Sequence, residues 1–202
     1  MPLGSCERFT TVRTRVNAST LIDTDIRRLH LPSMTHRLEF VETIHDRAAV
    51  RKLLFDYYTD ILPRFEALGG PELDAGDMAD DTLNDPGTLL PPHHRFLLAY
   101  DVSNTLLGCG SLKRIRDDAA EMKRMFVRDA ARGTGLGRAL FEDRIAEARR
   151  MGLKWLYADT IKGNRAMLAI YEKHGFDYID RYPENTNPEE FAPYLVFLRL
   201  KL

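Results

Sequence analysis

The 202-residue sequence contains little cysteine: it has only Cys6 and Cys109, and no Cys/His cluster shows the spacing of zinc ligands. It therefore has neither a disulfide framework nor a recognisable zinc-binding pattern. Long hydrophobic runs are also missing, since runs such as residues 96–100 are far shorter than the ~18 apolar residues of a membrane-spanning helix. Neither sign of charge is in excess, because 29 Lys and Arg oppose 30 Asp and Glu. This balance provides no basic surface for sequence-independent binding to nucleic acids or membranes.

What remains is the composition of an ordinary globular protein. Hydrophobic residues make up 44% of the chain and charged residues 29%, which argues against a disordered chain. The length exceeds one domain of ~150 residues by about a third, and it suffices to bury a core without disulfides or metal ions. We therefore expect a cytoplasmic α/β protein with one domain and an extension.

Residues 1–35 differ from the rest of the sequence. They show no sustained periodicity, and five Arg against three acidic residues give them a net charge of +2. They lack the apolar segment of a secretory signal, and Pro2 excludes myristoylation. We expect an extension that is disordered, or absent from a working protein that starts at Met34. The basic, hydroxyl-rich beginning leaves an organellar transit peptide as the alternative.

Residues 36–202 alternate between strand and helix patterns. Strands are predicted over residues 37–42, 95–100, 106–113, 121–127, 155–161, 176–182 and 194–200. A first helix follows the capping-box spacing of Thr43 and Asp46 and ends or kinks at Pro63. Later helices end at residue 151 and cover residues 164–174. This order predicts a mixed central sheet of about six to seven strands, flanked by about four helices.

A glycine-rich loop precedes the helix that ends at residue 151. It reads Arg132-Gly133-Thr134-Gly135-Leu136-Gly137. The glycines let backbone N–H groups approach an anion closely, and the helix that starts there favours negative charge at its N-terminus. The spacing fits neither the dinucleotide fingerprint, whose third glycine position holds Arg138, nor a P-loop. We interpret the loop as a phosphate-binding site, with a plain turn before a helix as the alternative.

Two segments resemble motifs of the GNAT superfamily of acyl-CoA N-acyltransferases. Residues 121–140, EMKRMFVRDAARGTGLGRAL, are similar to motif A, which has Arg/Gln-x-x-Gly-x-Gly/Ala after a strand ending in Val. Residues 164–176, NRAMLAIYEKHGF, are similar to motif B, with its Asn, its Tyr and its closing Gly-Phe. Asp129 stands where many relatives have Pro, and residues 185–192 carry no recognisable acceptor signature. The resemblance implies one GNAT domain over residues 36–202.

By this resemblance the co-substrate is acetyl-CoA, with no metal ion. The pyrophosphate would bind the backbone amides of Arg132, Gly133, Thr134, Gly135, Leu136 and Gly137. The pantetheine would lie along Met125, Phe126 and Val127, on a strand that carries a bulge in the superfamily. A backbone N–H freed near Val127 would then bind the thioester carbonyl, where negative charge develops. Asn164 would bind pantetheine or simply cap its helix.

Two residues are candidates for catalysis. By the resemblance, Tyr171 would protonate the departing CoA thiolate; alternatively it fills the core, because it shares an apolar helical stripe with Met167. Glu121 is the candidate base for the acceptor ammonium, since it lies on the strand of the carbonyl donor. Its alternative role is that of a solvated edge residue or a cross-strand partner for Lys or Arg. Cys109 is expected to be a small buried hydrophobe, with a reactive thiol as the minor alternative.

The implied activity is N-acetylation of a primary amine on a small or amino-acid-like acceptor. Residues 66–85 contain seven acidic residues and no Lys or Arg. As a cleft rim they would favour cationic amines without an adjacent carboxylate; otherwise they form a solvated loop. A peptide or protein acceptor, and a catalytically silent acyl-CoA-binding module, stay open as alternatives. We expect a monomer or homodimer, with no nucleic-acid or membrane partner.

Overall fold

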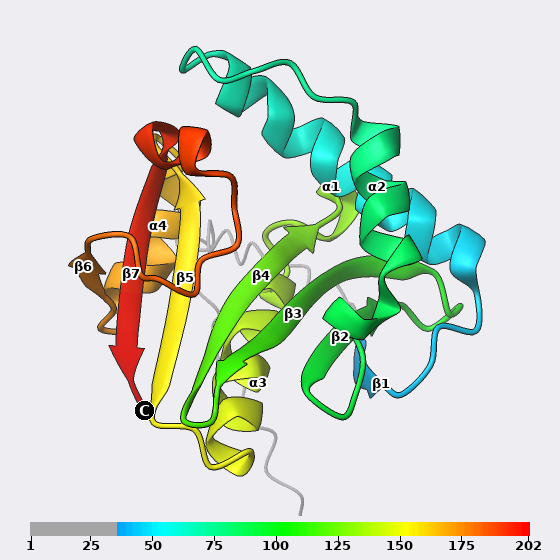
Figure 1. Ribbon diagram of the computed structural model, residues 1–202. Coiled ribbons are helices and arrows are strands. Elements are labelled where there is room, and N and C mark those ends of the chain that lie inside the picture. The colour runs from blue at the N-terminus through cyan, green and yellow to red at the C-terminus, as the bar shows by residue number, and fades with distance from the viewer. Residues whose placement is uncertain (1–35) are drawn as a thin grey trace, which may run out of the picture. The chain divides into compact units, whose positions relative to one another are not determined.

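The computed structural model describes residues 36–202, so the predictions for residues 1–35 lie outside the described part. These residues form one seven-stranded sheet in the order β1-β2-β3-β4-β5-β7-β6 (Figure 1). The strands are β1 (Arg37–Val41), β2 (His94–Tyr100), β3 (Leu106–Arg116), β4 (Ala119–Val127), β5 (Trp155–Ile161), β6 (Asp177–Ile179) and β7 (Leu195–Lys201). The helices are α1 (Arg47–Glu66), α2 (Ala75–Asn84), α3 (Leu136–Arg150) and α4 (Arg165–Lys173), with short 3₁₀ turns η1 (Pro86–Thr88), η2 (Asp129–Ala131) and η3 (Glu189–Tyr194). The expected α/β fold with a mixed sheet is confirmed.

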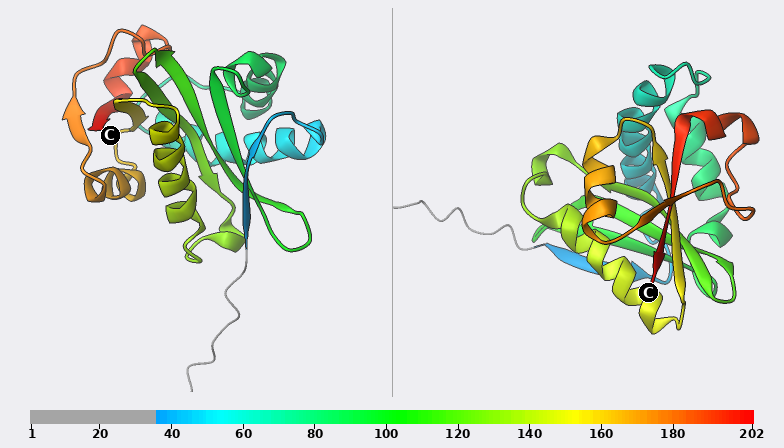
Figure 2. Two further views of the ribbon diagram at one scale, coloured as in Figure 1. Left: turned by 90° about the horizontal axis from the view of Figure 1, so that it is seen from below. Right: turned by 90° about the vertical axis from the view of Figure 1, so that its left-hand side faces the viewer.

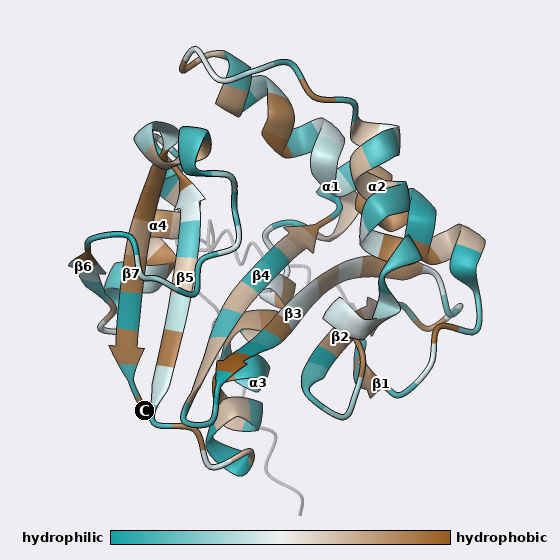
Figure 3. Cartoon of the chain, viewed as in Figure 1, coloured by the Kyte–Doolittle hydropathy of each residue, from teal (hydrophilic) through white to brown (hydrophobic). Residues whose placement is uncertain are grey.

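The helices cover both faces of the sheet. Figure 2 shows α1 and α2 on one face and α3 and α4 on the other. Because side chains alternate along a strand, neighbouring residues of β2 serve the two sides: Phe96 packs in the core under α1, and Leu97 packs in the core under α3. Hydrophobic and hydrophilic residues alternate around the helices (Figure 3), as one-sided packing requires. No helix among residues 36–202 is long and apolar enough to cross a membrane.

The single parallel pair in the sheet, β4 with β5, pairs over only part of its length. The register runs from Ala119 opposite Trp155 to Met122 opposite Ala158. Both strands continue beyond that point, and Figure 1 shows them diverging towards their carboxyl ends. The sheet is therefore open between β4 and β5, which creates space for a ligand next to α1.

The first helix is not capped as predicted, and it does not end at Pro63. Its N-cap is Asp46, whose carboxylate accepts the amide of Ala49, so Thr43 does not cap it. It also continues through Pro63 to Glu66. The buried side chain of Phe65 explains this continuation, because packing against the core holds the last turn in place.

The second half of the acidic segment 66–85 forms a helix, α2, which the sequence did not predict. Asp74 caps α2 by accepting the amides of Gly76 and Asp77, and Leu83 is buried against α1. Asp80 pairs with Arg51 at 2.6 Å, so part of the acidic charge is neutralised within the protein.

Two strands also differ from their predicted lengths. Strand β3 extends to Arg116, and β6 has only three residues.

Candidate active site

A β-bulge interrupts the pairing of β3 with β4 next to the open part of the sheet. Cys109 pairs with Phe126 and Ser111 pairs with Lys123, so β4 has one more residue than β3 in this interval. Arg124 adopts a left-handed conformation with φ of 53°. The expected bulge on this strand is confirmed, and the residues without a partner on β3 are Arg124 and Met125. The bulge therefore lies before Val127 rather than at it.

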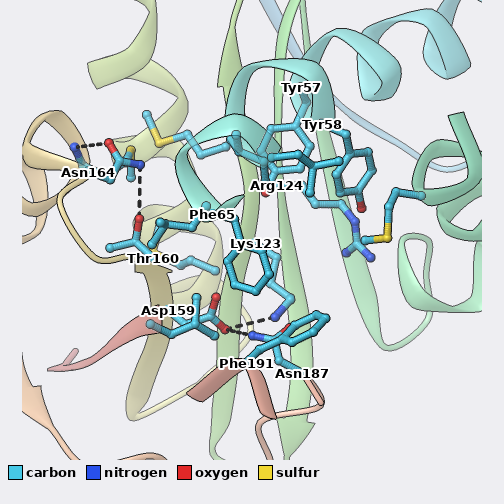
Figure 4. A pocket seen from close by; sticks show the side chains of 18 of the residues that line it. Tyr57, Tyr58, Phe65, Lys123, Arg124, Asp159, Thr160, Asn164, Asn187 and Phe191 are labelled. Carbon is cyan, nitrogen blue, oxygen red and sulfur yellow. Dashed lines mark hydrogen bonds and ion pairs between the residues drawn. The ribbon is translucent and has the colours of Figure 1, made fainter. Parts of the chain in front are cut away.

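A cavity of about 230 Å³ opens where β4 and β5 separate (Figure 4). Side chains from α1, α2, β4, β5, α4 and η3 line it, and most of them are apolar or aromatic. Its polar wall residues, apart from three tyrosines, are Lys123, Arg124, Asp159, Thr160, Asn164 and Asn187. An apolar pocket with a few convergent polar groups is the usual form of a small-molecule site.

Tyr171 lines this cavity from α4. Its ring packs against Phe141 and Phe176 at 5.4 Å and 4.9 Å between centroids, and only 3% of the residue is exposed. Its hydroxyl makes no hydrogen bond with any of residues 36–202. Burial raises the pKa of Tyr171, so the hydroxyl keeps its proton well into the alkaline range. The ring thus fills the core while the residue still lines the cavity with a proton to donate.

Glu121 is fully buried and does not line the cavity. One carboxylate oxygen, Oε1, accepts hydrogen bonds from the Tyr182 hydroxyl and, at 3.0 Å each, from Asn185 and Lys123. The other oxygen, Oε2, is buried without a partner among the described residues. Burial raises the pKa of Glu121 above its usual value, although the Lys123 ammonium works against this.

Asp159, which the sequence analysis missed, is the carboxylate that does line the cavity. Its Oδ2 accepts hydrogen bonds from Asn185 at 2.8 Å, Asn187 at 3.0 Å and Lys123 at 3.2 Å. Burial works to raise the pKa of Asp159, but the Lys123 charge and these hydrogen bonds outweigh it, so that pKa lies below its usual range. An aspartate inside the apolar strand 155–161 was the signal that could have revealed it. We call Glu121, Lys123 and Asp159 the acid–lysine cluster.

The glycine loop has the shape that its glycines permit. Gly133 and Gly135 have φ of 79° and 90°, a left-handed region that side chains other than glycine rarely occupy. Gly135 is the N-cap of α3, and it offers no side chain to cap the first amides of the helix. The Thr134 hydroxyl donates to the carbonyl of Ala131 at 2.7 Å and fixes the turn, while Leu136 is buried. The Leu136 amide donates to the Thr134 hydroxyl at 3.4 Å, whereas the next two amides, of Gly137 and Arg138, donate to no side chain among residues 36–202.

Arg132 holds this loop to α1. Its guanidinium pairs with Asp60 at 3.0 Å and with Asp129 at 2.9 Å, and its Nε donates to the carbonyl of Val127 at 3.1 Å. The guanidinium of Arg132 is therefore engaged with protein groups.

Of the remaining residues predicted to bind acetyl-CoA, some line the cavity and others do not. Met125 lines the cavity, whereas Phe126 is buried in the core and packs edge-on against Tyr57. Asn164 fulfils the capping role, since its Oδ1 accepts the amide of Met167 at 3.4 Å, and it also lines the cavity. The capping role of Asn164 is therefore confirmed, and its contact with pantetheine stays a prediction.

A reactive thiol and a bound metal receive no support from the described residues. Cys109 is fully buried, and burial raises the pKa of its thiol to about 12, so it stays protonated at neutral pH. Residues 36–202 contain no group of three or more His, Cys, Asp or Glu that is able to hold a metal ion.

The chain is similar to known acetyltransferases. The sequence profile of the Acetyltransferase (GNAT) family matches residues 48–176. An IAA acetyltransferase from Azospirillum brasilense is 40% identical over 113 residues, which cover 55% of this chain and 67% of that protein. An uncharacterised N-acetyltransferase from Schizosaccharomyces pombe is 28% identical over 134 residues, covering 66% of this chain and 79% of its own.

Solved structures share the fold. A GNAT-family acetyltransferase from Staphylococcus aureus superimposes with a TM-score of 0.64 at 18% identity, covering 82% of this chain and 100% of the other. The PaiA N-acetyltransferase from Thermoplasma acidophilum, in complex with coenzyme A, superimposes with a TM-score of 0.63 at 16% identity, covering 84% and 100%.

Proposed function

Because the chain belongs to the acetyltransferase (GNAT) family, we propose that it transfers the acetyl group of acetyl-CoA to a primary amine of a small acceptor. The family and its relatives make the protein an N-acetyltransferase; the donor and the type of acceptor are the proposal. One observation carries it: Met125 lines the cavity, and its Cε lies 3.7 Å from where a Cβ on Gly137 would be. The cavity and the glycine loop are therefore adjacent.

Acetyl-CoA would contact both the glycine loop and the cavity. Its pyrophosphate would accept hydrogen bonds from the amides at the start of α3, where the helix dipole favours negative charge. The thioester arm would then enter between β4 and β5, where the strands no longer pair. The coenzyme A bound to the Thermoplasma acidophilum protein of this fold supports the choice of donor.

The reaction forms a C–N bond and breaks a C–S bond. The neutral amine attacks the thioester carbon, negative charge develops on the carbonyl oxygen, and the thiolate leaves. A backbone N–H at the bulge would stabilise that oxygen, an interaction worth roughly 3 kcal/mol in comparable sites. Tyr171 would donate its proton to the leaving sulfur, the acceptor nitrogen would release its second proton to solvent as the amide forms, and Tyr171 would recover a proton from solvent.

The acid–lysine cluster would bind the acceptor ammonium and remove its proton. An ammonium with a pKa of ~10 must lose a proton before it attacks. Asp159 faces the cavity and is suited to hold the ammonium, but its lowered pKa makes it a weak proton acceptor. Glu121, whose pKa is raised, would accept the proton. Lys123 donates hydrogen bonds to both carboxylates and so links Glu121 to Asp159 in the cavity wall.

Calorimetric titration with coenzyme A and a thiol-release assay with a panel of amines test this function. We expect binding of coenzyme A and amine-dependent thiol release. Binding without turnover on any small amine or peptide would indicate a silent acyl-CoA-binding module, and turnover on peptides alone would indicate a peptide N-acetyltransferase. The absence of binding would contradict the assignment of the glycine loop.

A further inference from the structure

Arg124 is a cation in the cavity wall without a partner among residues 36–202. Its Nε and Nη1 atoms are buried, and neither forms a hydrogen bond. No carboxylate of residues 36–202 lies within ion-pair distance of it. The adjacent Lys123, by contrast, pairs with both Glu121 and Asp159. Shielding a charge from water costs free energy unless an opposite charge pairs with it. An anionic group of a ligand would therefore bind favourably at Arg124.

The bulge determines where this side chain points. In a regular strand, Lys123 and Arg124 would face opposite sides of the sheet. The extra residue and the left-handed conformation of Arg124 bring both side chains into the cavity wall. Figure 4 shows Arg124 beside Tyr57 and Tyr58, whereas Asp159 lies beside Lys123 and Asn187. The cavity therefore offers a free cation and a carboxylate at different places.

Resting on the function proposed above, we propose that Arg124 binds a carboxylate of the acceptor, so that the acceptor is an amino acid with an apolar or aromatic body. Its ammonium would lie at Asp159, its carboxylate at the guanidinium of Arg124, and its body against the ring of Phe65 and its neighbours. The planar guanidinium suits a carboxylate better than a point charge does.

This inference differs from the preference predicted from the acidic segment 66–85. That segment contributes Leu73 and Met78 to the cavity wall, and none of its carboxylates lines it. Asp80 pairs with Arg51, away from the cavity. The acidic charge of the segment therefore does not offset Arg124.

Matched acceptor pairs test the inference. Leucine and leucinamide, and phenylalanine and phenylalaninamide, present the same side chain and an α-amine with or without the carboxylate. We expect the full-length protein to have the higher kcat/KM with the acids. Arg124→Met should lower the acid-to-amide ratio of kcat/KM at least tenfold and raise KM for the acid, with KM for acetyl-CoA unchanged. Arg124→Lys, which keeps the charge without the planar fork, should give an intermediate ratio.

Arg150→Met is the matched control. Arg150 lies at the end of α3, its side chain is 64% exposed, and it pairs with Glu147, so this change should leave the ratio as it is. A thermal shift by coenzyme A checks that each variant is folded. If Arg124→Met does not fold, the inference is tested by comparing the acid-to-amide ratio of kcat/KM in the wild type with that in Arg124→Lys.

The inference and the underlying function fail differently. A wild-type preference for the amides, or an unchanged ratio in the Arg124 variants with coenzyme A still bound, overturns the carboxylate site alone. A KM effect on acetyl-CoA instead of the acceptor would mean that Arg124 serves the donor, and also overturns it. Absence of turnover with every acceptor, or of coenzyme A binding, removes the proposed function and the inference with it.

Discussion

A Cβ atom on Gly110 would lie 2.7 Å from Nε of Arg144, so the missing side chain at residue 110 of β3 leaves room for a buried guanidinium from α3. Arg144 donates to the carbonyls of Leu140 at 3.1 Å and Lys123 at 3.4 Å. Because Lys123 directly precedes Arg124, this contact supports the bulge from the face of the sheet opposite α1.

Gly110→Ala should therefore destabilise the protein by about 1–3 kcal/mol, the usual cost of overpacking a core. Denaturant unfolding measures the change. In an Arg144→Met background the same substitution should cost less, because the guanidinium that it displaces is gone. Equal costs in the two backgrounds would contradict the proposed contact.

Gly135→Ala and Gly137→Ala test the glycine loop as a pair. An alanine at residue 135 is strained by about 1–2 kcal/mol at φ near 90°, so the unliganded loop should relax to another conformation. Binding must then restore the strained one, and we expect the Kd for coenzyme A to rise about 5- to 30-fold. An alanine at residue 137 meets Met125 and Val127 at an ordinary 3.7 Å, and should change the Kd by less than about threefold. Equal effects in calorimetric titrations would show that loop conformation does not govern binding.

Tyr171→Phe should lower kcat by ~10²-fold or more if the hydroxyl protonates the thiolate, with KM for acetyl-CoA unchanged. Stability should change little, because the ring contacts persist and the hydroxyl has no hydrogen-bond partner among the described residues. Since burial raises the pKa of Tyr171, wild-type kcat should not fall on its account below about pH 10.

Tyr178→Phe is a suitable control for this substitution. Tyr178 is 54% exposed on β6, and its hydroxyl donates to Glu172. Its variant should keep the wild-type kcat. An unchanged rate of coenzyme A release in Tyr171→Phe would remove Tyr171 from the mechanism.

Glu121→Gln should remove the rise of kcat/KM with pH that follows ionisation of the base, leaving only the titration of the acceptor amine. Asp159→Asn should instead raise KM for the acceptor, because it removes the charge that faces the cavity. Steady-state pH profiles with one low-pKa amine separate the two effects. A Glu121→Gln profile with the wild-type shape and lower amplitude would indicate a structural role.

Stability gives an independent check on Glu121. Because burial raises its pKa in the folded protein, the folded state holds the proton more tightly than the unfolded chain. Its contribution to stability is complete below the unfolded pKa, near 4.3, and is lost as the pH rises through the raised folded value. The Tm of Glu121→Gln relative to wild type should therefore increase over that pH range. A relative Tm that falls with rising pH would contradict the raised pKa.

Features that depend on neighbours along the chain could be predicted well. The glycine loop, the helix behind it and the apolar stripe that contains Tyr171 were correctly recognised, because glycine conformation and helical periodicity are local properties. The acidic segment shows the limit of this reasoning. Its charge suggested a loop, yet Asp74 caps a helix there and Leu83 buries it against α1.

Local pattern alone predicted the family of this protein and the position of its glycine-rich turn, because those properties reside in consecutive residues. The positions of Arg124, Asp159 and Glu121 depended on the folded arrangement. One extra residue in β4 turns Arg124 into the cavity, and the separation of β4 from β5 exposes Asp159 there while Glu121 stays buried. Strand register and strand separation arise from packing between distant segments, so alternation along one strand does not reveal them.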